Sequence, residues 1–248
     1  MTRSQSVIVV LGGFLVLWEA WVRIAGVPVY FLPAPSAIFL EIAQDPSWYA
    51  RHSAYTVGAC LLGFAMALVI GIAAAIGIVY SKVLENTLYT FLVSLNSIPK
   101  IALAPLFIIW MGTNLSSKVA ISMLIALFAV VIDTVLGLRS VDPDVLDMAK
   151  SMRARPLQVL WKIRFPSALP AMFAGFRISA GLSVVGEIVG GFFFQKGPSD
   201  LGILINTCVD QLNTGLLFGA VFASALLGVI VFWLFTGLGR LIYGSWKE

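Results

Sequence analysis

The sequence is poor in charge, histidine and cysteine, and each shortage excludes a class of function. Only 11% of the 248 residues are charged and 60% are hydrophobic, which disfavours a soluble globular domain. His52 is the one histidine, and Cys60 and Cys208 form no CxxC pair, so a metal site or a disulfide framework is not expected. We therefore predict no metal and no cofactor. A membrane enzyme, which needs clustered catalytic groups, is also disfavoured.

The sequence lacks a phosphate-binding loop of the form G-x-x-x-x-G-K-[ST], so the chain is not expected to bind ATP in the usual way or to be an enzyme. Its net charge of +4 is not gathered in a basic helix with base-reading polar residues, so no nucleic-acid partner is expected. The distribution of charge across a membrane explains these residues better.

Long hydrophobic runs dominate what is present. The mean hydropathy is +0.98, and six segments are long and apolar enough to cross about 30 Å of hydrocarbon. They must be helical, because unpaired backbone groups are costly in lipid. The predicted spans cover residues 7–26, 56–80, 88–112, 117–138, 168–194 and 216–242. The predicted fold class is an all-α integral membrane protein, with residues 1–248 forming one transmembrane domain surrounded by lipid.

The orientation follows from lysine and arginine near the span ends. The first run could be a cleaved signal peptide, because Arg3 precedes it, but no small-x-small cleavage site stands before Trp18, so we expect a true span. Six spans place both termini on one side. With the termini in the cytoplasm, ten of these cations face inward and four outward, as the positive-inside rule favours. A multi-pass protein of the cell inner membrane is predicted.

Charge gathers between the fourth and fifth predicted spans, where nine charged residues lie from Arg139 to Arg164. Asp142-Pro143 is a typical helix start, since aspartate caps and proline suits the first helical position. Arg155 precedes a proline and is disfavoured in a helix, so the chain should turn there. Pro156 can then begin a second helix, which Phe165-Pro166 is expected to end. The sequence therefore predicts that residues 139–167 form a cytoplasmic helix-turn-helix loop.

A loop that only sets topology would need cations but no paired amphipathic helices. Exposed apolar side chains combined with mixed charges are instead typical of a surface that docks another protein. The residues expected to form this surface are Asp147, Ala149, Arg153, Ala154, Leu157, Leu160 and Trp161.

Two spans carry faces of small residues. In the second span, small residues recur every four positions and would let another helix approach closely. They are Ala59, Gly63, Ala67, Gly71 and Ala75. In the fifth span a similar face runs through Ala171, Gly175, Ser179 and Ser183 to Glu187. We expect Glu187 to be shielded from lipid and to have a functional or structural partner, because an ionised carboxylate in hydrocarbon costs on the order of 3 kcal/mol or more.

The third span contains Pro99 and Pro105, which remove backbone donors and either leave carbonyls facing a cavity or kink the helix. The residues expected to line a solute pathway are Asn96, Pro99, Pro105, Asp133, Ser179, Ser183 and Glu187. Between the first two spans, Ile38, Phe39 and Ile42 at helical spacing predict a short interfacial helix, with a simple connector as the alternative.

The charged loop resembles the EAA loop of ABC-transporter permeases, whose pattern begins Glu-Ala-Ala, has a glycine at its turn and ends in Ile-x-Leu-Pro. Asp147-Met148-Ala149 stand at the first three places, Arg153 at the glycine, and Ile163 to Pro166 at the end. The run SIPKIALAPLFIIWMGTN, from Ser97 to Asn114, is similar to the third span of the nitrate, sulfonate and taurine type of these permeases. The resemblance covers essentially the whole chain. The segment between Glu187 and Leu201 is longer than that type has.

The resemblance implies a type I importer permease with six transmembrane helices and a coupling loop between the fourth and fifth. It further implies a second permease copy forming a homodimer, two cytoplasmic ATP-binding subunits docked on the loop, and an extracytoplasmic binding protein that delivers a small solute. Relatives of this type carry nitrate, sulfonates, taurine or pyrimidine precursors of a vitamin. The alternative is a secondary transporter or channel, for which inverted repeats and more intramembrane charges are expected.

Overall fold

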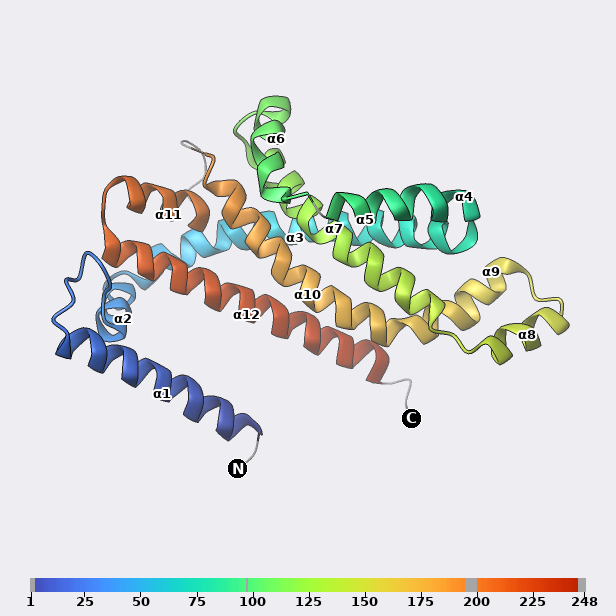
Figure 1. The fold of residues 1–248 in the computed structure, drawn as a ribbon, viewed down its shortest axis with the longest axis horizontal. Coiled ribbons are helices and arrows are strands. Elements are labelled where there is room, and N and C mark those ends of the chain that lie inside the picture. Colours follow the sequence, from blue (N-terminus) through green and yellow to red (C-terminus); the bar gives the residue numbers. More distant parts are fainter. Residues whose placement is uncertain (1–2, 97, 195–199, 245–248) are drawn as a thin grey trace.

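The computed structural model describes residues 3–96, 98–194 and 200–244 of the chain. Within these ranges all regular structure is helical, and the long helices lie side by side (Figure 1). The α-helices are α1 (Arg3–Ile24), α2 (Pro35–Gln44), α3 (Pro46–Tyr80), α4 (Lys82–Leu84), α5 (Thr90–Asn96), α6 (Ala104–Met111), α7 (Leu115–Arg139), α8 (Pro143–Ser151), α9 (Pro156–Val159), α10 (Phe165–Gly191), α11 (Leu201–Asp210) and α12 (Thr214–Gly244). The helix α11 was not predicted.

Four helices of the described part are long and apolar enough to cross a membrane. They are Pro46–Tyr80, Leu115–Arg139, Pro156–Gly191 and Thr214–Ile242, and they overlap the predicted spans 56–80, 117–138, 168–194 and 216–242. A bent pair of helices is a fifth candidate. The predicted first span coincides with α1, which is helical over 22 residues but is not among these candidates. The all-helical fold is therefore confirmed, with four or five candidate spans.

The bent pair occupies the predicted third span, which is not one continuous helix. Lys82–Leu95 and Lys100–Met111 meet at an angle of 94°. Pro99 lies at the break in extended backbone geometry, and Pro105 lies in the first turn of α6, where a missing donor does no harm. Of the two roles predicted for these prolines, the structure shows the break in the helix.

The core forms where α3, α7 and α10 pack against one another. The predicted small-residue face of α3 is confirmed, because all five of its members are buried. A Cβ atom added at Gly63 would lie 2.8 Å from Ser122 of α7, so a larger side chain does not fit there. On α10 the predicted face is buried from Gly175 to Glu187, whereas Ala171 is exposed. The small residues of α3 and α10 thus let the helix backbones approach closely, and this approach determines how the helices pack.

The predicted short helix between the first two spans is present as α2. Asp45 separates it from α3 and caps α3, since its carboxylate accepts hydrogen bonds from the Ser47 hydroxyl at 2.8 Å and the Trp48 amide at 3.0 Å. These two hydrogen bonds hold the pKa of Asp45 below its usual value. The ring of Phe39 on α2 meets Phe222 on α12 edge-on, at 5.3 Å between centroids. The helix α2 is therefore fixed against the bundle.

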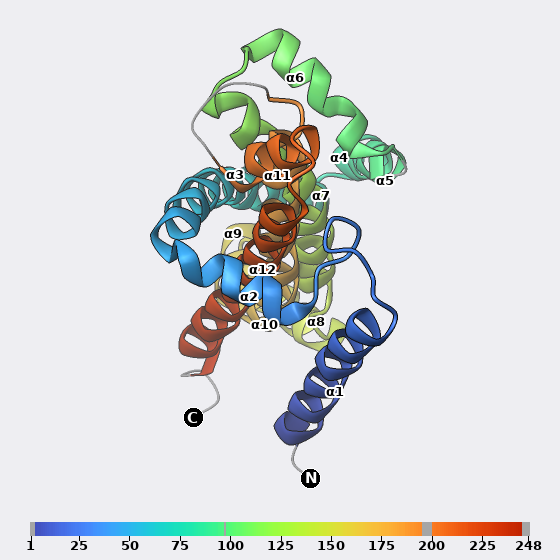
Figure 2. The same cartoon turned by 90° about the vertical axis from the view of Figure 1, so that its left-hand side faces the viewer.

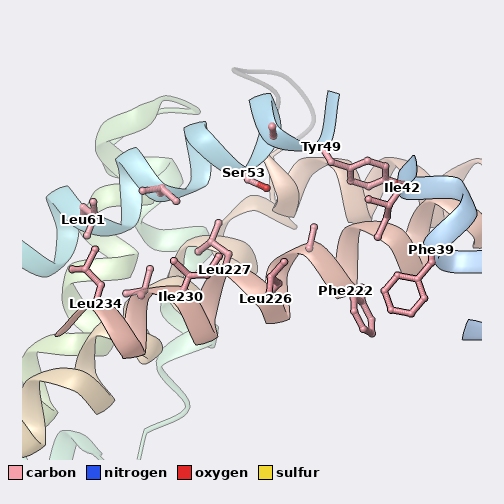
Figure 3. A pocket seen from close by; sticks show the side chains of 14 residues that line it. Phe39, Ile42, Tyr49, Ser53, Leu61, Phe222, Leu226, Leu227, Ile230 and Leu234 are labelled. Atoms are coloured by element: carbon pink, nitrogen blue, oxygen red, sulfur yellow. The ribbon is translucent and has the colours of Figure 1, made fainter. Parts of the chain in front are cut away.

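An apolar groove of about 430 Å³ runs between α3 and α12 (Figure 3). Phe39 and Ile42 of α2 line one end of the groove, and Leu61 and Leu234 line the other. Almost all of its surface is hydrocarbon, as expected for a groove between two helices that are long enough to span a membrane.

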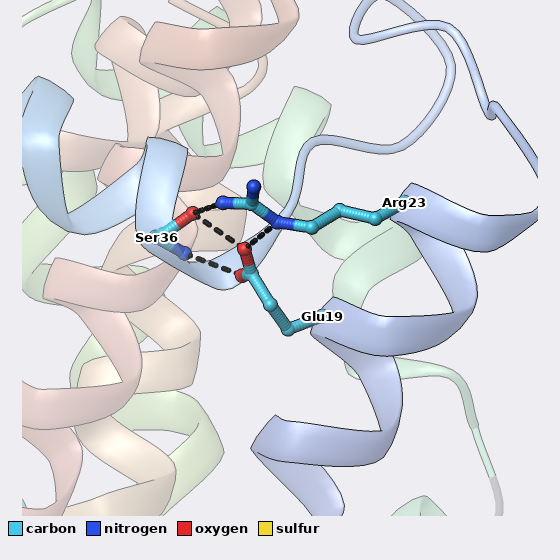
Figure 4. Close-up of polar contacts among 3 residues, drawn as sticks. All are labelled: Glu19, Arg23 and Ser36. Carbon is cyan, nitrogen blue, oxygen red and sulfur yellow. Dashed lines mark hydrogen bonds and ion pairs between the residues drawn. The ribbon is translucent and has the colours of Figure 1, made fainter.

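The first helix lies beside the bundle and is joined to α2 by a small polar cluster (Figures 2 and 4). Glu19 of α1 accepts a hydrogen bond from the Ser36 hydroxyl at 2.7 Å and from the Ser36 amide at 3.0 Å. Arg23 pairs with the same carboxylate at 2.5 Å and donates to the Ser36 hydroxyl at 3.2 Å. This cluster holds the end of α1 at the start of α2.

Candidate functional site

The predicted helix-turn-helix is present and projects from one end of the bundle, opposite α2 and α11 (Figure 1). We call residues 142–164 the hairpin. Its first helix, α8, begins as predicted, with the Asp142 carboxylate accepting the Asp144 amide at 2.9 Å and Pro143 in the first turn. Lys150 and Asp147 form an exposed ion pair one turn apart, at 2.7 Å. Local sequence is sufficient to specify this helix.

The turn of the hairpin depends on an unusual backbone conformation at Arg153. This residue has a φ of 53°, in the left-handed region that favours glycine. Its amide donates to the carbonyl of Lys150 at 2.8 Å, and the next amide, of Ala154, donates to the carbonyl of Ala149 at 3.0 Å. This pair of bonds is the Schellman arrangement that closes a helix end. Arg153 therefore makes the turn at the position where the EAA pattern has glycine.

The second limb of the hairpin does not stop at Phe165-Pro166, and that prediction was wrong. Helical structure continues from Pro156 to Gly191, passing from α9 through a π-helical turn, Leu160–Arg164, into α10. The π turn changes the hydrogen-bond register, and Pro166 then lies in the first turn of α10, where it needs no donor. The second limb of the hairpin and a candidate membrane span consequently form one continuous helix.

Two polar contacts fix the hairpin base to the neighbouring helices, and an ion pair lies beside them. The Arg164 guanidinium donates to the carbonyl of Leu138 at the end of α7, at 3.0 Å. The Tyr80 hydroxyl at the end of α3 donates to the carbonyl of Pro156 at 3.2 Å. Nearby, Arg139 pairs with Glu85 at 2.7 Å. A displacement of the hairpin would therefore be transmitted to α3, α7 and α10 together.

The side chains predicted to dock a partner divide into exposed and buried groups. Leu157 and Trp161 are 69% and 58% exposed, Asp147 and Arg153 are exposed, and Ala154 is half-buried. Leu160 is only 3% exposed, because it packs in the hydrophobic core cluster that includes Leu138 and Ala168. Ala149 is also buried. The expectation that these two side chains are exposed was wrong, and they stabilise the hairpin from within.

Met148 and Met152 are two exposed hairpin residues that were not among those predicted to dock a partner. With Leu157 and Trp161 they are the four most exposed of the large apolar side chains of the hairpin, and we call these four the apolar hairpin set. Met148 stands at the second place of the Glu-Ala-Ala pattern, next to the buried Ala149 but about 100° around the helix from it. Flexible methionine side chains suit a contact surface that must adapt to a partner.

Residues 67–243 match the family described as "Binding-protein-dependent transport system inner membrane component". The chain belongs to this family. The permease is 34% identical over 232 residues to the riboflavin transport system permease protein RibX of Chloroflexus aurantiacus, covering 92% of this chain and 85% of that protein. It is 31% identical over 219 residues to the formylaminopyrimidine transport permease protein ThiX of Halalkalibacterium halodurans, covering 88% and 86%.

Among solved structures, the permease is similar in fold to a chain of an inward-facing MetNI methionine ABC transporter, with a TM-score of 0.67 and 19% identity. The match covers 80% of this chain and 96% of that chain.

Permeases of the sulfonate and taurine type are also its relatives, so the resemblance found in the sequence is confirmed. The permease is a multi-pass inner-membrane component of a binding-protein-dependent ABC importer for small solutes. It works with a separate ATPase and a binding protein, and is not itself the ATPase.

The predicted pathway residues fall in three places. Pro99 and Pro105 are exposed at the break between α5 and α6. Asn96 ends α5, but its side chain lies outside the described residues. Asp133 on α7 is half-buried and lies against Gly175, where an added Cβ would collide with its carboxylate.

Ser179, Ser183 and Glu187 form the third group and are buried between α10, α3 and α7. The carbonyl of Ser183 accepts a hydrogen bond from Ser122 of α7 at 2.9 Å. Neither carboxylate oxygen of Glu187 has a hydrogen-bond partner among the described residues. This group therefore lies inside the subunit, away from its surface.

Glu187 lines a small cavity of about 110 Å³ with Lys118 and Asp200. Lys118 and Asp200 form an ion pair, and Thr56 accepts the Leu201 amide at 3.1 Å beside it. Lys118 is thus a charged neighbour of Glu187 across this cavity, although its ion pair is with Asp200. In the sequence analysis Lys118 was one of the four cations placed on the outer side of the membrane. Asp200 was not singled out there, although an aspartate just before an apolar helical run is a recognisable cap.

Proposed function

We propose that the permease acts as one of two identical copies, and that each copy docks one ATPase subunit through its hairpin. The apolar hairpin set supplies the contact, with Asp147 and Arg153 setting its register. Obligate contacts of this kind combine buried apolar side chains with surrounding charges. The residues proposed for docking are therefore Met148, Met152, Leu157 and Trp161, with Ala149 and Leu160 supporting them from inside.

The observation that carries this proposal is the continuous helix from Pro156 to Gly191. Because the hairpin base is also bonded to α3 and α7, ATPase subunits that move the two hairpins together would tilt these helices as a unit. Rigid-body movement about an interface is a common way to switch between two conformations. The switch here is between inward-facing and outward-facing arrangements.

We further propose that both termini lie in the cytoplasm and that α1 is a sixth span. The start of α1 and the end of α12 point toward the same end of the molecule as the hairpin (Figure 1). That end also carries most of the lysine and arginine, in agreement with the positive-inside rule. The polar link from Glu19 to Ser36 would then lie at the opposite membrane face.

The carried solute is proposed to be a small organic molecule delivered by the binding protein. The relatives named above are permeases for riboflavin and formylaminopyrimidine, and more distant relatives serve sulfonates and taurine. Along the pathway we propose that the break at Pro99 and Pro105 faces the solute, because both residues are exposed there. Ser179, Ser183, Glu187 and Asp133 would meet it only if α7 and α10 separate.

The docking proposal is tested by Leu157→Asp in the permease expressed with its ATPase. We expect this substitution to abolish copurification of the ATPase while membrane insertion is retained, because a carboxylate at the contact would be desolvated. Leu212→Asp is the matched control, since Leu212 is an 84% exposed leucine at the opposite end of the molecule. Retention of the ATPase by Leu157→Asp, or its equal loss in Leu212→Asp, would overturn the assignment.

A further inference from the structure

We propose that Arg177 binds the anionic group of the carried solute in the groove between α10 and α12. The inference rests on the proposed function, in which two copies enclose a solute pathway, and it adds a chemical class of solute and a residue that recognises it. Arg177 belongs neither to the hairpin nor to the buried cluster around Glu187.

The groove is open and holds about 460 Å³. Helices α10 and α12 form its two sides (Figure 1), and Gly181 and Gly228 contribute to its lining. A Cβ atom added at either glycine would meet no atom within 4 Å, so the groove has free space along both helices. No carboxylate lines it. Arg177 is the one ionisable side chain among its lining residues.

Arg177 is half-buried and its guanidinium lies over the ring of Phe232, 5.6 Å from the centroid. Its Nε atom is buried and has no hydrogen-bond acceptor among the described residues. The contact with Phe232 offsets part of the positive charge through the ring face. It leaves the buried Nε–H donor without the acceptor that it needs.

The depth of Arg177 argues against a lipid headgroup as its partner. Arg177 lies close to the midpoint of α10, a helix of 27 residues, so at 1.5 Å per residue it is about 20 Å from either end. Lipid phosphates lie at the membrane surfaces. A cation at this depth is costly in hydrocarbon and is typical of residues that face a protein interior or a water-filled pathway.

The chemistry of the site defines the ligand. A planar guanidinium pairs in two-point fashion with carboxylate, sulfonate or phosphate oxygens. The apolar walls and the exposed ring of Trp233 suit a hydrocarbon or aromatic body attached to that group. A neutral solute would leave the charge of Arg177 uncompensated. The predicted solute is therefore a small organic anion.

The test uses the permease copurified with its ATPase in phosphatidylcholine nanodiscs, with benzenesulfonate as the probe and uncharged methyl phenyl sulfone as its counterpart. Wild type should bind the anion at least about tenfold more tightly than the neutral compound. Arg177→Gln should remove this preference, and Arg177→Lys, which keeps the charge but not the planar two-point donor, should retain part of it. Arg240→Gln, an exposed arginine near the end of α12, is the matched control and should behave as wild type.

Equal binding of the two compounds by wild type, or a preference that persists in Arg177→Gln, would overturn the proposal. Repeating the measurement with phosphatidylglycerol in the nanodiscs separates the two sources of anion. If this lipid displaces benzenesulfonate from wild type, the groove is a lipid site and the solute proposal fails. ATPase retention is measured in the same samples, so failure of the docking proposal is detected independently of anion binding.

Discussion

Lys118 on α7 and Asp200 at the start of α11 form an ion pair in which each side chain is only 3% exposed. The Lys118 ammonium also lies 4.8 Å from the centre of the Phe194 ring, and Asp200 caps α11 by accepting the Ile203 amide at 2.8 Å. One ion pair thus joins helices that are 82 residues apart in the sequence. It fixes α11 against the end of the core that lies farthest from the hairpin.

Removing one partner of this pair should destabilise the permease strongly. We expect Lys118→Met to lower the free energy of unfolding by about 3–5 kcal/mol, because a buried carboxylate is left uncompensated. Lys150→Met, which removes an exposed pair with Asp147, should change it by less than about 1 kcal/mol. Thermal unfolding in detergent measures both. Equal effects of the two substitutions would show that the buried pair is not structural.

Glycine at position 153, where the hairpin turns, should make the permease more stable than arginine does. A left-handed conformation costs a non-glycine residue about 1–2 kcal/mol, and part of the relief is offset by the greater freedom of glycine in the unfolded chain. Arg153→Gly is therefore expected to raise the free energy of unfolding by up to about 1 kcal/mol. Arg155→Gly, where the backbone is extended, should lower it or leave it unchanged. A loss of stability in Arg153→Gly would contradict the turn geometry.

The packing of α3 on α7 should respond to a single methyl group at Gly63. An alanine there would place its Cβ 2.8 Å from Ser122 and from the carbonyl of Val119, so we expect a loss of about 1–3 kcal/mol. Gly58 on the same helix has nothing within 4 Å of its Cβ position, and Gly58→Ala should gain up to about 1 kcal/mol from helix propensity. The unfolding midpoints of Gly63→Ala and Gly58→Ala, each compared with that of wild type, test the expected loss and the expected gain.

The proposed orientation can be measured by cysteine labelling in intact cells. Cys60 and Cys208 are both buried, so background reaction should be low. A membrane-impermeant maleimide should label Leu212→Cys, at the α11 end, and should fail to label Ser151→Cys on the hairpin until the cells are permeabilised. Labelling of Ser151→Cys in intact cells would show that the hairpin lies outside the cytoplasm, where it could not contact the ATPase. The proposed orientation would then be wrong.

The hairpin shows which features local sequence can specify. The start of α8 and the turn near Arg155 were predictable, because a capping aspartate and two prolines act through neighbouring residues. The continuation past Phe165-Pro166 was not predictable in this way. A proline normally ends a helix, but here a π turn from Leu160 to Arg164 precedes Pro166, and Arg164 of this turn bonds to the end of α7. Leu160, the first residue of the turn, is buried in the core.

The sequence by itself determined that this chain is an all-helical membrane protein with a charged hairpin between two spans, since hydrophobicity, caps and helix breakers act over a few residues. Only the tertiary structure decided which side chains are available. Leu160 and Leu157 are alike in type, yet one supports the core and the other is exposed. The side chains around Lys118, Asp200 and Arg177 come from helices that are distant in the sequence. The burial of these three residues and the compensation of their charges therefore depend on those helices rather than on neighbouring residues.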